Sequence, residues 1–226
     1  TVAAEQKKST KSTSGNVVQV DAVTAKIKVP VYKPPKRGAP AARVGGGTRG
    51  VDGVLPDVYV LAPDHVGLTT HEQPTLSWYM SKPTAIHFEF SLIDENGIEP
   101  LLELTLEAGN LKAGIQGLDL AKYGIKLKPE VQYQWSVALV PDSKKRSSDV
   151  IASGMIERRG VDNSIAERLS KADAQEDVFI YAEKGYWYDA VSELSVLIDK
   201  NPGNKILRQQ RAELLKQAGL PDELGK

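Results

Sequence analysis

The stretch Leu127–Val140, LKPEVQYQWSVALV, decides the fold of this 226-residue chain. From Val131 onward, bulky apolar residues alternate with polar or smaller ones, which is typical of a half-buried strand inside an antiparallel sheet. The apolar face consists of Val131, Tyr133, Trp135, Val137 and Leu139. Leu127, Pro129 and Tyr133 have the spacing of a tyrosine corner, in which the tyrosine hydroxyl ties the incoming loop to the strand.

Similar stretches precede and follow this one, and each is short and bounded by turn residues. They are Val58–Ala62 with its continuation through residue 74, Thr75–Met80, Ile86–Ile93, Leu102–Leu106, Gly114–Leu120 and Asp149–Glu157. The Asn-Gly pair before residue 98 predicts a hairpin. About seven such strands predict a β-sandwich of the immunoglobulin or fibronectin type III kind, with Trp78 and Trp135 meeting in its core.

The period changes from two to that of a helix after residue 160. Ile165, Leu169 and Ala172 recur at helical spacing, and Ser164 with Glu167 has the form of a capping box. Gly185 is expected to end this helix, and two more are predicted over residues 187–199 and 204–218. The chain is therefore expected to be mainly β with an α-helical tail.

The segment GYWYDAVSELSVLIDKNPGN, residues 185–204, resembles a tetratricopeptide repeat. A single repeat is rarely stable alone, so we expect it to pack on the sandwich or on a partner. The aromatic residues Tyr186, Trp187 and Tyr188 allow two interpretations. They either pack between structural elements or form a docking surface for sugars or proline-rich peptides.

Charge is divided unevenly between the two parts of the chain. Residues 1–50 carry ten basic and two acidic residues, a balance of +8, so the rest carries −8 because the whole chain is neutral. A basic arm on an acidic body suits an anionic partner, including the body of another copy, although it also suits a merely solvated tail. We expect no nucleic-acid partner.

Val17–Tyr32 is predicted to be a long strand, with one change of apolar phase near residue 22. It either completes its own sandwich or is donated to another copy. Residues Lys33–Gly53 form a Pro- and Gly-rich connector, too unlike a phosphate-binding loop in its spacing to suggest nucleotide binding. The self-assembly strand comprises Val18, Val20, Val23, Ala25, Ile27, Val29 and Val31.

Several motifs between residues 31 and 159 resemble an uncharacterised bacterial family, domain of unknown function nine-two-eight. They are YKPPKRGAP from Tyr32, RVGGGTRG from Arg43, LAPDHVGLTTHEQPTLSWY, YGIKLKPEVQYQW, and RSSD running into ASGMIER. The resemblance implies an exported envelope protein to which no reaction is assigned. On these motifs, the arm and the helical tail are expected to be additions of this chain.

Catalytic and metal-binding patterns are weak throughout the sequence. The three histidines are His65, His71 and His87, and His71-Glu72 lacks the second histidine of a zinc-protease motif. There are no cysteines, which excludes thiol nucleophiles, thiolate metal sites and disulfides. We expect no enzymatic activity, no cofactor and no bound metal.

The domains are expected to be an arm and linker over 1–53, an immunoglobulin-like sandwich over 54–160, and a tetratricopeptide-like tail over 161–226. The predicted function is a structural subunit of an envelope or extracellular assembly, polymerising head-to-tail by donating its N-terminal strand. The alternative is a monomeric periplasmic module that docks partners through its tail, and other envelope proteins are potential partners. No apolar run reaches the roughly 20 residues of a transmembrane helix, and the start at Thr1 suggests a removed signal peptide.

Overall fold

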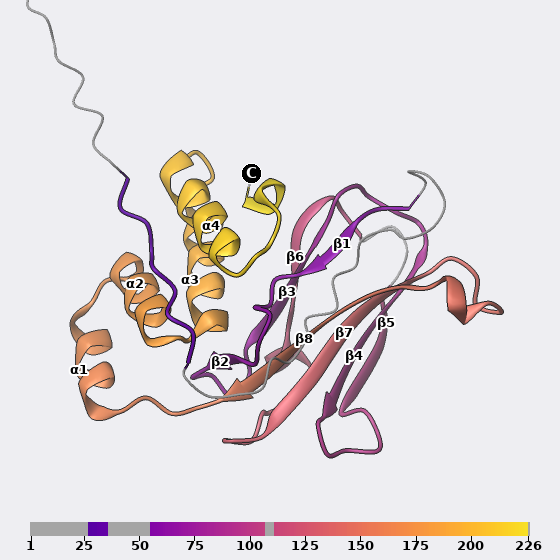
Figure 1. Cartoon of the computed structure of the whole chain (residues 1–226), viewed down its shortest axis with the longest axis horizontal. Coiled ribbons are helices and arrows are strands. Elements are labelled where there is room, and N and C mark those ends of the chain that lie inside the picture. The colour runs from indigo at the N-terminus through magenta and orange to yellow at the C-terminus, as the bar shows by residue number, and fades with distance from the viewer. Residues whose placement is uncertain (1–26, 36–54, 107–110, 226) are drawn as a thin grey trace, which may run out of the picture.

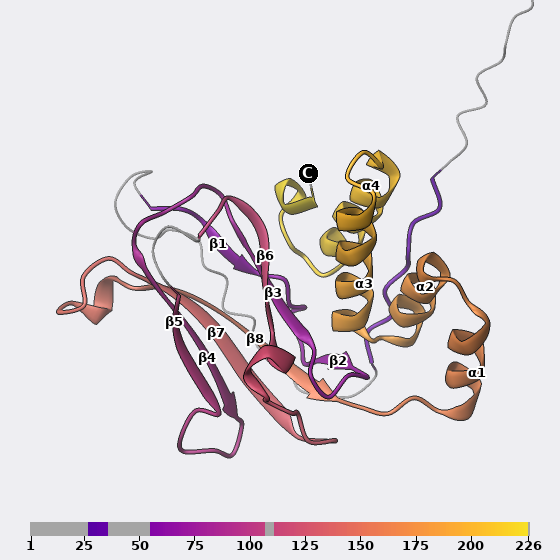
Figure 2. The same ribbon diagram turned by 180° about the vertical axis from the view of Figure 1, so that it is seen from behind.

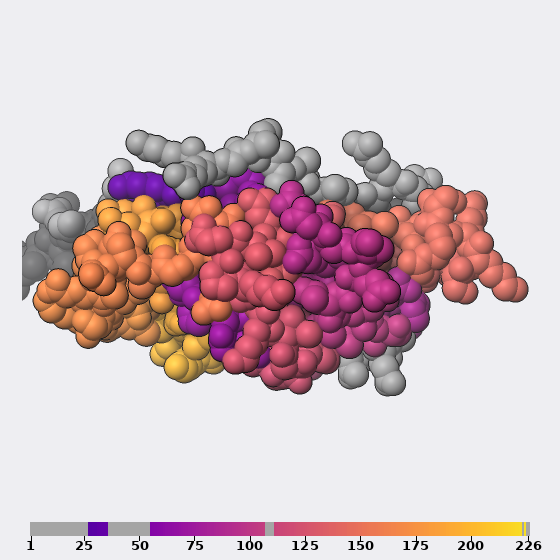
Figure 3. All heavy atoms as spheres, turned by 90° about the horizontal axis from the view of Figure 1, so that it is seen from below, coloured from indigo at the N-terminus to yellow at the C-terminus, as the bar shows by residue number. Residues whose placement is uncertain are grey.

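The computed structural model describes residues 27–35, 55–106 and 111–225. In these parts the fold is mixed α/β, with two β-sheets followed by four α-helices near the C-terminus (Figure 1). The strands are β1 (Val58–Val60), β2 (Gly67–Thr69), β3 (Thr75–Met80), β4 (His87–Asp94), β5 (Leu102–Leu106), β6 (Gly114–Asp119), β7 (Gln132–Val140) and β8 (Val150–Arg158). The helices lie beside the sheets at one end of the molecule (Figure 3).

The chain crosses repeatedly between the two sheets. One sheet has the order β1-β3-β6, and the other has the order β2-β8-β7-β4-β5. Neighbours are antiparallel except for β2 and β8, which run parallel. β7, formed by the stretch that opened the sequence analysis, lies in the middle of the larger sheet and pairs with both β4 and β8.

The apolar faces of the two sheets pack into a shared core. On β7, the residues predicted to face inward from Tyr133 to Leu139 are all buried. Phe90 of β4 lies between the two tryptophans expected to meet, with ring centroids 6.5 Å from Trp78 and 6.3 Å from Trp135. The two large rings are thus joined through a third.

The loop before β7 is fixed by Tyr133. The backbone N–H of Lys128 donates a hydrogen bond of 2.9 Å to the Tyr133 hydroxyl, which is the contact that the spacing predicts. Leu127 is buried, and its carbonyl accepts a hydrogen bond from Arg158 at 3.1 Å. Strands β7 and β8 are therefore tied together beyond their ladder.

The course of β2 differs from the prediction of a continuous edge strand. After β1 the chain leaves the smaller sheet, and Gly67–Thr69 pairs in parallel with Ile156–Arg158 of β8 in the larger sheet. All three residues are buried, so this strand has no exposed face and no alternating pattern to predict it from.

The helices are α1 (Asn163–Lys171), α2 (Ala174–Lys184), α3 (Trp187–Lys200) and α4 (Lys205–Gln217). The first two interrupt what was predicted as one helix, because Asp173 turns out of the helix and caps α2. The capping-box prediction was wrong as well. Asp162 caps α1 by accepting a hydrogen bond from Ile165 N–H, while Ser164 lies inside the helix.

The N-terminal segment Ile27–Pro35 does not form the strand predicted through residue 32. It is extended but pairs with no described strand, and it runs between α2 and the pair formed by α3 and α4 (Figures 1 and 2). Its backbone hydrogen bonds go to helical residues instead of a sheet edge. Residues 17–26 of the predicted strand, and the glycine-rich connector from 36 to 53, lie outside the described residues.

Candidate functional site

The aromatic segment at the start of α3 joins the helices to the sheets. Tyr186, Trp187 and Tyr188 are all buried, so they do not form the exposed docking surface that was one interpretation of them. The Trp187 indole N–H donates to the Leu61 carbonyl at 2.8 Å, and the Tyr186 hydroxyl donates to the Gly160 carbonyl at 2.9 Å. These residues pack the single helical unit onto the strands.

Tyr188 extends this joint into the centre of the larger sheet. Its hydroxyl accepts a hydrogen bond from the Trp135 indole at 2.9 Å and donates to the Met155 carbonyl at 3.0 Å. Gly67 leaves room for the ring, because a Cβ there would lie 2.6 Å from Cε2 of Tyr188. Burial raises the pKa of Tyr188, which therefore stays neutral and able to donate.

Asp189 anchors the strand β2 to the same helix turn. Its carboxylate is buried and accepts hydrogen bonds from the Thr69 hydroxyl at 2.5 Å and from Thr70 N–H at 2.7 Å. The ring of His71 contributes Nδ1 at 3.1 Å from the same carboxylate. This hydrogen bond holds the pKa of His71 above its ordinary value, against the opposing effect of burial.

The Asp189–His71 pair resembles part of a catalytic dyad, but its hydrogen bonds hold the β2 region on α3 and do not activate a nucleophile. A general base that activates a nucleophile needs the hydroxyl on the second ring nitrogen. Here the Thr70 hydroxyl shares Nδ1 with Asp189, at 3.2 Å. Among the described residues, no hydroxyl bonds to Nε2 of His71, and no group of three His, Asp or Glu is arranged to hold a metal ion.

The helical tail holds the segment Ile27–Pro35 by its backbone. The Gln217 side chain accepts from Tyr32 N–H at 2.8 Å and donates to the Pro30 carbonyl at 2.8 Å. Gln210 donates to the Lys28 carbonyl at 2.8 Å. On the other side, Lys33 N–H donates to the Ala182 carbonyl of α2 at 3.0 Å. Backbone atoms supply the segment's half of all four bonds.

Pro30 and Tyr32 are the buried residues of the segment, and Tyr32 carries the larger side chain. Its ring is buried and meets Trp187 edge-on, with centroids 4.9 Å apart. The hydroxyl is 2.8 Å from Nε2 of His65, whose other ring nitrogen is 2.9 Å from an Asp64 carboxylate oxygen. Burial is also the main cause that raises the pKa of Tyr32. This tyrosine thus contacts both the helical tail and the loop after β1.

Weaker contacts border the segment at each end. The Lys28 ammonium lies 4.5 Å from the centre of the Phe179 ring, and Lys33 is 3.8 Å from a Glu183 carboxylate oxygen. Gly185, which ends α2 with φ of 83°, also makes room for the segment, because a Cβ there would approach the Lys33 carbonyl to 2.9 Å. The same glycine therefore ends a helix and admits the bound backbone.

The proposed self-assembly residues are only partly described. Ile27 and Val29 are half-buried on the tail, whereas Val31 is 56% exposed, so these residues do not share one buried strand face. Val18, Val20, Val23 and Ala25 lie outside the described residues. For the described part, the partner is the chain's own helical tail.

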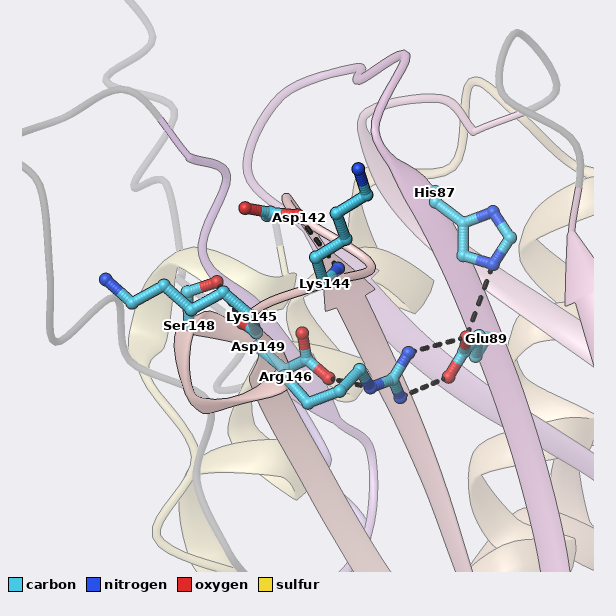
Figure 4. Close-up of polar contacts among 8 residues, drawn as sticks. All are labelled: His87, Glu89, Asp142, Lys144, Lys145, Arg146, Ser148 and Asp149. Carbon is cyan, nitrogen blue, oxygen red and sulfur yellow. Dashed lines mark hydrogen bonds and ion pairs between the residues drawn. The ribbon is translucent and has the colours of Figure 1, made fainter.

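The third histidine belongs to an exposed ion-pair cluster between β4 and the loop after β7 (Figure 4). Arg146 contacts both carboxylate oxygens of Glu89, at 2.9 and 2.6 Å, and Asp149 at 2.9 Å. His87 lies 3.3 Å from Glu89, while the side chains of Lys144 and Lys145 point away from this pair. Within this cluster, Arg146 and His87 pair with the carboxylates. The ammonium groups of Lys144 and Lys145 are the cations drawn there that could bind an anion from outside.

The sequence reasoning missed Gln210 and Gln217, which hold the bound segment. Residues seven apart lie on one face of a helix, but the buried Leu207 and Leu214 share this face, so the sequence contains no sign of a polar binding face. Nor could it show that the face contacts the N-terminal segment, because Gln217 and Tyr32 are 185 residues apart in the sequence.

Comparison with known proteins places both the strands and the helices in one family. The model of the family described as Domain of Unknown Function (DUF928) matches residues 44–224. The chain belongs to this family. The match continues through α4, so the helical tail is part of the DUF928 unit. The expectation that the tail is an addition of this chain was wrong.

Other comparisons give little beyond the DUF928 assignment. No curated protein matches the chain. Among solved structures, a crystal structure of an engineered protein matches with 9% identity and a TM-score of 0.32, over 48% of this chain and 21% of that one. The match thus spans about a fifth of that engineered protein. The described residues contain no helix with the length and apolar character needed to cross a membrane.

Proposed function

We propose that this protein is a non-enzymatic interaction module of the bacterial envelope or extracellular space. Its two sheets form a fibronectin type III-like sandwich, and its helices form a tetratricopeptide-like unit that grips an extended chain segment. The crossing of the chain between sheets and the Tyr133 contact support the sandwich assignment. The succession of α2, α3 and α4, with Trp187 and Ala190 of α3 completely buried, supports the helical assignment.

The observation that carries the proposal is the way in which the tail holds Ile27–Pro35. Gln210 and Gln217 form hydrogen bonds with backbone carbonyl and N–H groups, which are accessible in any extended peptide. Tyr32 adds one side chain of defined shape in the pocket beside Trp187. Recognition of an extended backbone with one or two side-chain anchors is a recurrent mode of peptide binding. In this structure the chain's own arm occupies the site.

The experiment that tests this function separates the arm from its site. A chain of residues 36–226 is mixed with a fluorescent peptide, IKVPVYKPP, that corresponds to residues 27–35. We expect saturable binding by fluorescence anisotropy and a higher melting temperature of the shortened chain, since a ligand that binds only the folded state stabilises it.

Two matched controls identify the source of binding. A peptide with Tyr32→Ala loses the buried ring, and a shortened chain with Gln217→Leu loses two backbone hydrogen bonds, so each is expected to bind at least about tenfold more weakly, about 1.4 kcal/mol. The proposal fails if the peptide neither binds nor raises the melting temperature. It also fails if both controls behave like the unmodified pair.

A second candidate function is head-to-tail assembly, in which the arm enters the tail of a neighbouring copy. It is favoured by the fact that every described strand comes from residues 58–158, so the sheets themselves do not require the arm. The opposite charges of residues 1–50 and the rest would favour the encounter between copies. Such a contact is heterologous and can propagate into a filament.

A further inference from the structure

A polar cleft separates the smaller sheet from the helical tail on a different side of α4 from the arm. Its volume is about 640 Å³. Strands β3 and β6 form one wall, and helices α3 and α4 form the other. On α4, Arg208 and Arg211 line the cleft, whereas Gln210 and Gln217 face the arm. Helix α4 therefore presents one set of polar side chains to the cleft and another to the arm.

Arg211 is the unusual group in this cleft. Its side chain is buried, with 7% of the residue exposed, although guanidinium groups are rarely buried without a carboxylate partner. Its one described hydrogen bond, from Nη1 to the Ser195 hydroxyl, is long at 3.4 Å, and its Nε has no partner. No ion pair of Arg211 occurs among the described residues. The charge is therefore buried without an ion pair, although the exposed Asp199 carboxylate offsets it in part and Arg208 repels it.

The surroundings of Arg211 supply what a polar anion would need. Arg208, whose own guanidinium is partly held by the Pro202 carbonyl, and the exposed Lys122 add two further positive charges to the lining. Hydroxyls from both walls line the same space, as do the carboxylates of Asp119 and Asp199. Arginine and lysine suit phosphate or carboxylate groups, while carboxylates and hydroxyls suit sugar hydroxyls.

We propose that this cleft binds a small polyhydroxylated anion, such as a sugar phosphate or a sugar acid, with its anionic group on Arg211. The anion supplies the direct ion pair that Arg211 does not make with any described carboxylate, since Asp199 acts on this guanidinium only from beyond ion-pair distance. A cleft of about 640 Å³ lies within the usual range for small-molecule sites. This site is separate from the arm-binding face and does not depend on the function proposed above.

The test uses the full chain and four compounds: glucose 6-phosphate, glucuronate, inorganic phosphate and neutral glucose. Binding is measured by isothermal titration calorimetry and by the shift in melting temperature. We expect glucose 6-phosphate or glucuronate to bind at least about tenfold more tightly than glucose. The stronger of the two identifies phosphate or carboxylate as the preferred group, and inorganic phosphate shows whether the hydroxyls contribute.

Variants separate a ligand-binding arginine from a structural one. Arg211→Met removes a buried charge that makes no ion pair, so the free protein is expected to melt no lower than the unmodified chain while binding falls at least about tenfold. Arg208→Gln and Lys122→Gln, both accessible positions, are expected to weaken binding in the same direction. Lys144→Met, on the loop after β7, is the matched control and should leave binding unchanged.

Three results would overturn the proposal. The first is that no anion binds more tightly than glucose. The second is that Arg211→Met and Arg208→Gln bind as the unmodified chain does. The third is that Arg211→Met melts far below the unmodified chain while Arg208→Gln and Lys122→Gln bind normally, which would assign Arg211 to holding α3 and α4 together.

Discussion

Asp189 connects three backbone or side-chain donors of the β2 region to the first turn of α3. Because the carboxylate is buried, leaving it without these hydrogen bonds would be costly. Thr69 and Thr70 donate to it independently of His71, whereas the contribution of His71 depends on whether its ring is protonated. The hydrogen bonds that hold β2 on α3 therefore include one group, His71, whose charge changes with pH.

The His71 contact predicts a pH dependence of stability. The pKa of His71 is raised in the folded chain, first by the hydrogen bond to Asp189, with the Asp189 and Glu193 charges acting in the same direction. A raised folded-state pKa means that the stabilisation is fully present below the unfolded value of about 6.5 and is lost as pH rises through the folded value. The melting temperature should therefore favour the unmodified chain over His71→Gln more at pH 6 than at pH 8.5.

The measurement is thermal unfolding of both chains at the two pH values, with His87→Gln as the control. Among the described residues, His87 forms its ion pair with the half-buried Glu89 of the same strand, away from the joint. Equal differences at the two pH values would show that His71 does not become charged against Asp189 in the folded chain.

Some residue-scale contacts could be predicted from sequence and others could not. Leu127 and Tyr133 are close in the sequence, so their spacing alone predicts the hydroxyl contact that fixes the loop before β7. His71 and Asp189 are 118 residues apart, and nothing in the sequence links the two positions. Their pairing depends on β2 joining the larger sheet, which the sequence did not indicate.

At the scale of elements, the start of α3 determines how helices and sheets combine. Trp187 is completely buried, and it belongs to one apolar core with residues of both sheets and of α4. A single helical repeat cannot bury its own apolar face, and here the loop after β1 and the centre of the larger sheet contact it. Sheets and helices should therefore unfold together.

Trp187→Ala tests this shared core. Removing a fully buried tryptophan is expected to cost about 3 to 5 kcal/mol of unfolding free energy, because it leaves a cavity and an unpaired Leu61 carbonyl. Chemical denaturation is followed by far-UV circular dichroism, which reports on the helices, and by fluorescence of the sheet residues Trp78 and Trp135. Both signals should shift together to a lower midpoint.

A matched control on the same helix is Val196→Ala, since Val196 is exposed and should change the midpoint little. If the helix signal of Trp187→Ala shifts while the tryptophan fluorescence keeps its original midpoint, the tail and the sheets are independent units. That result would contradict the single core.

Prediction from sequence was strongest for elements with a clear period. Alternation placed β3, β4 and β7 close to their observed bounds, since one face of each is buried, and it placed β5, whose inward face is half-buried. β2 lacks this signal, because its residues are buried on both faces. The single long helix predicted before Gly185 failed because Asp173 satisfies the first N–H groups of a new helix better than it continues the old one.

At the scale of the whole molecule, the proposed function depends on whether the N-terminal arm binds a sheet edge or the helical tail. Alternation over residues 17–32 predicted a strand, but only a sheet edge at the right distance can turn that pattern into one. In Ile27–Pro35, the glutamines of α4 and the pocket for Tyr32 provide an alternative partner. Pro30 and Pro34, which cannot donate to a ladder, also favour this course.

The measurement that tests this placement most directly is a disulfide trap, which has no background because the chain has no cysteine. Lys33 N–H is bonded to the Ala182 carbonyl, and the Lys33 and Glu183 side chains lie on the surface beside each other. The double variant Lys33→Cys, Glu183→Cys is oxidised and run on a denaturing, non-reducing gel. Lys33→Cys with Lys144→Cys is the control, since the loop after β7 lies at the other end of the molecule (Figure 3).

If each arm occupies the tail of its own chain, the Lys33/Glu183 variant gives a cross-linked monomer that migrates faster than its reduced form, and the control does not cross-link. A ladder of covalent oligomers would assign the arm to the tail of a neighbouring copy and support head-to-tail assembly. Absence of any Lys33–Glu183 cross-link, with both thiols reactive, would contradict the central claim that the helical tail holds the arm.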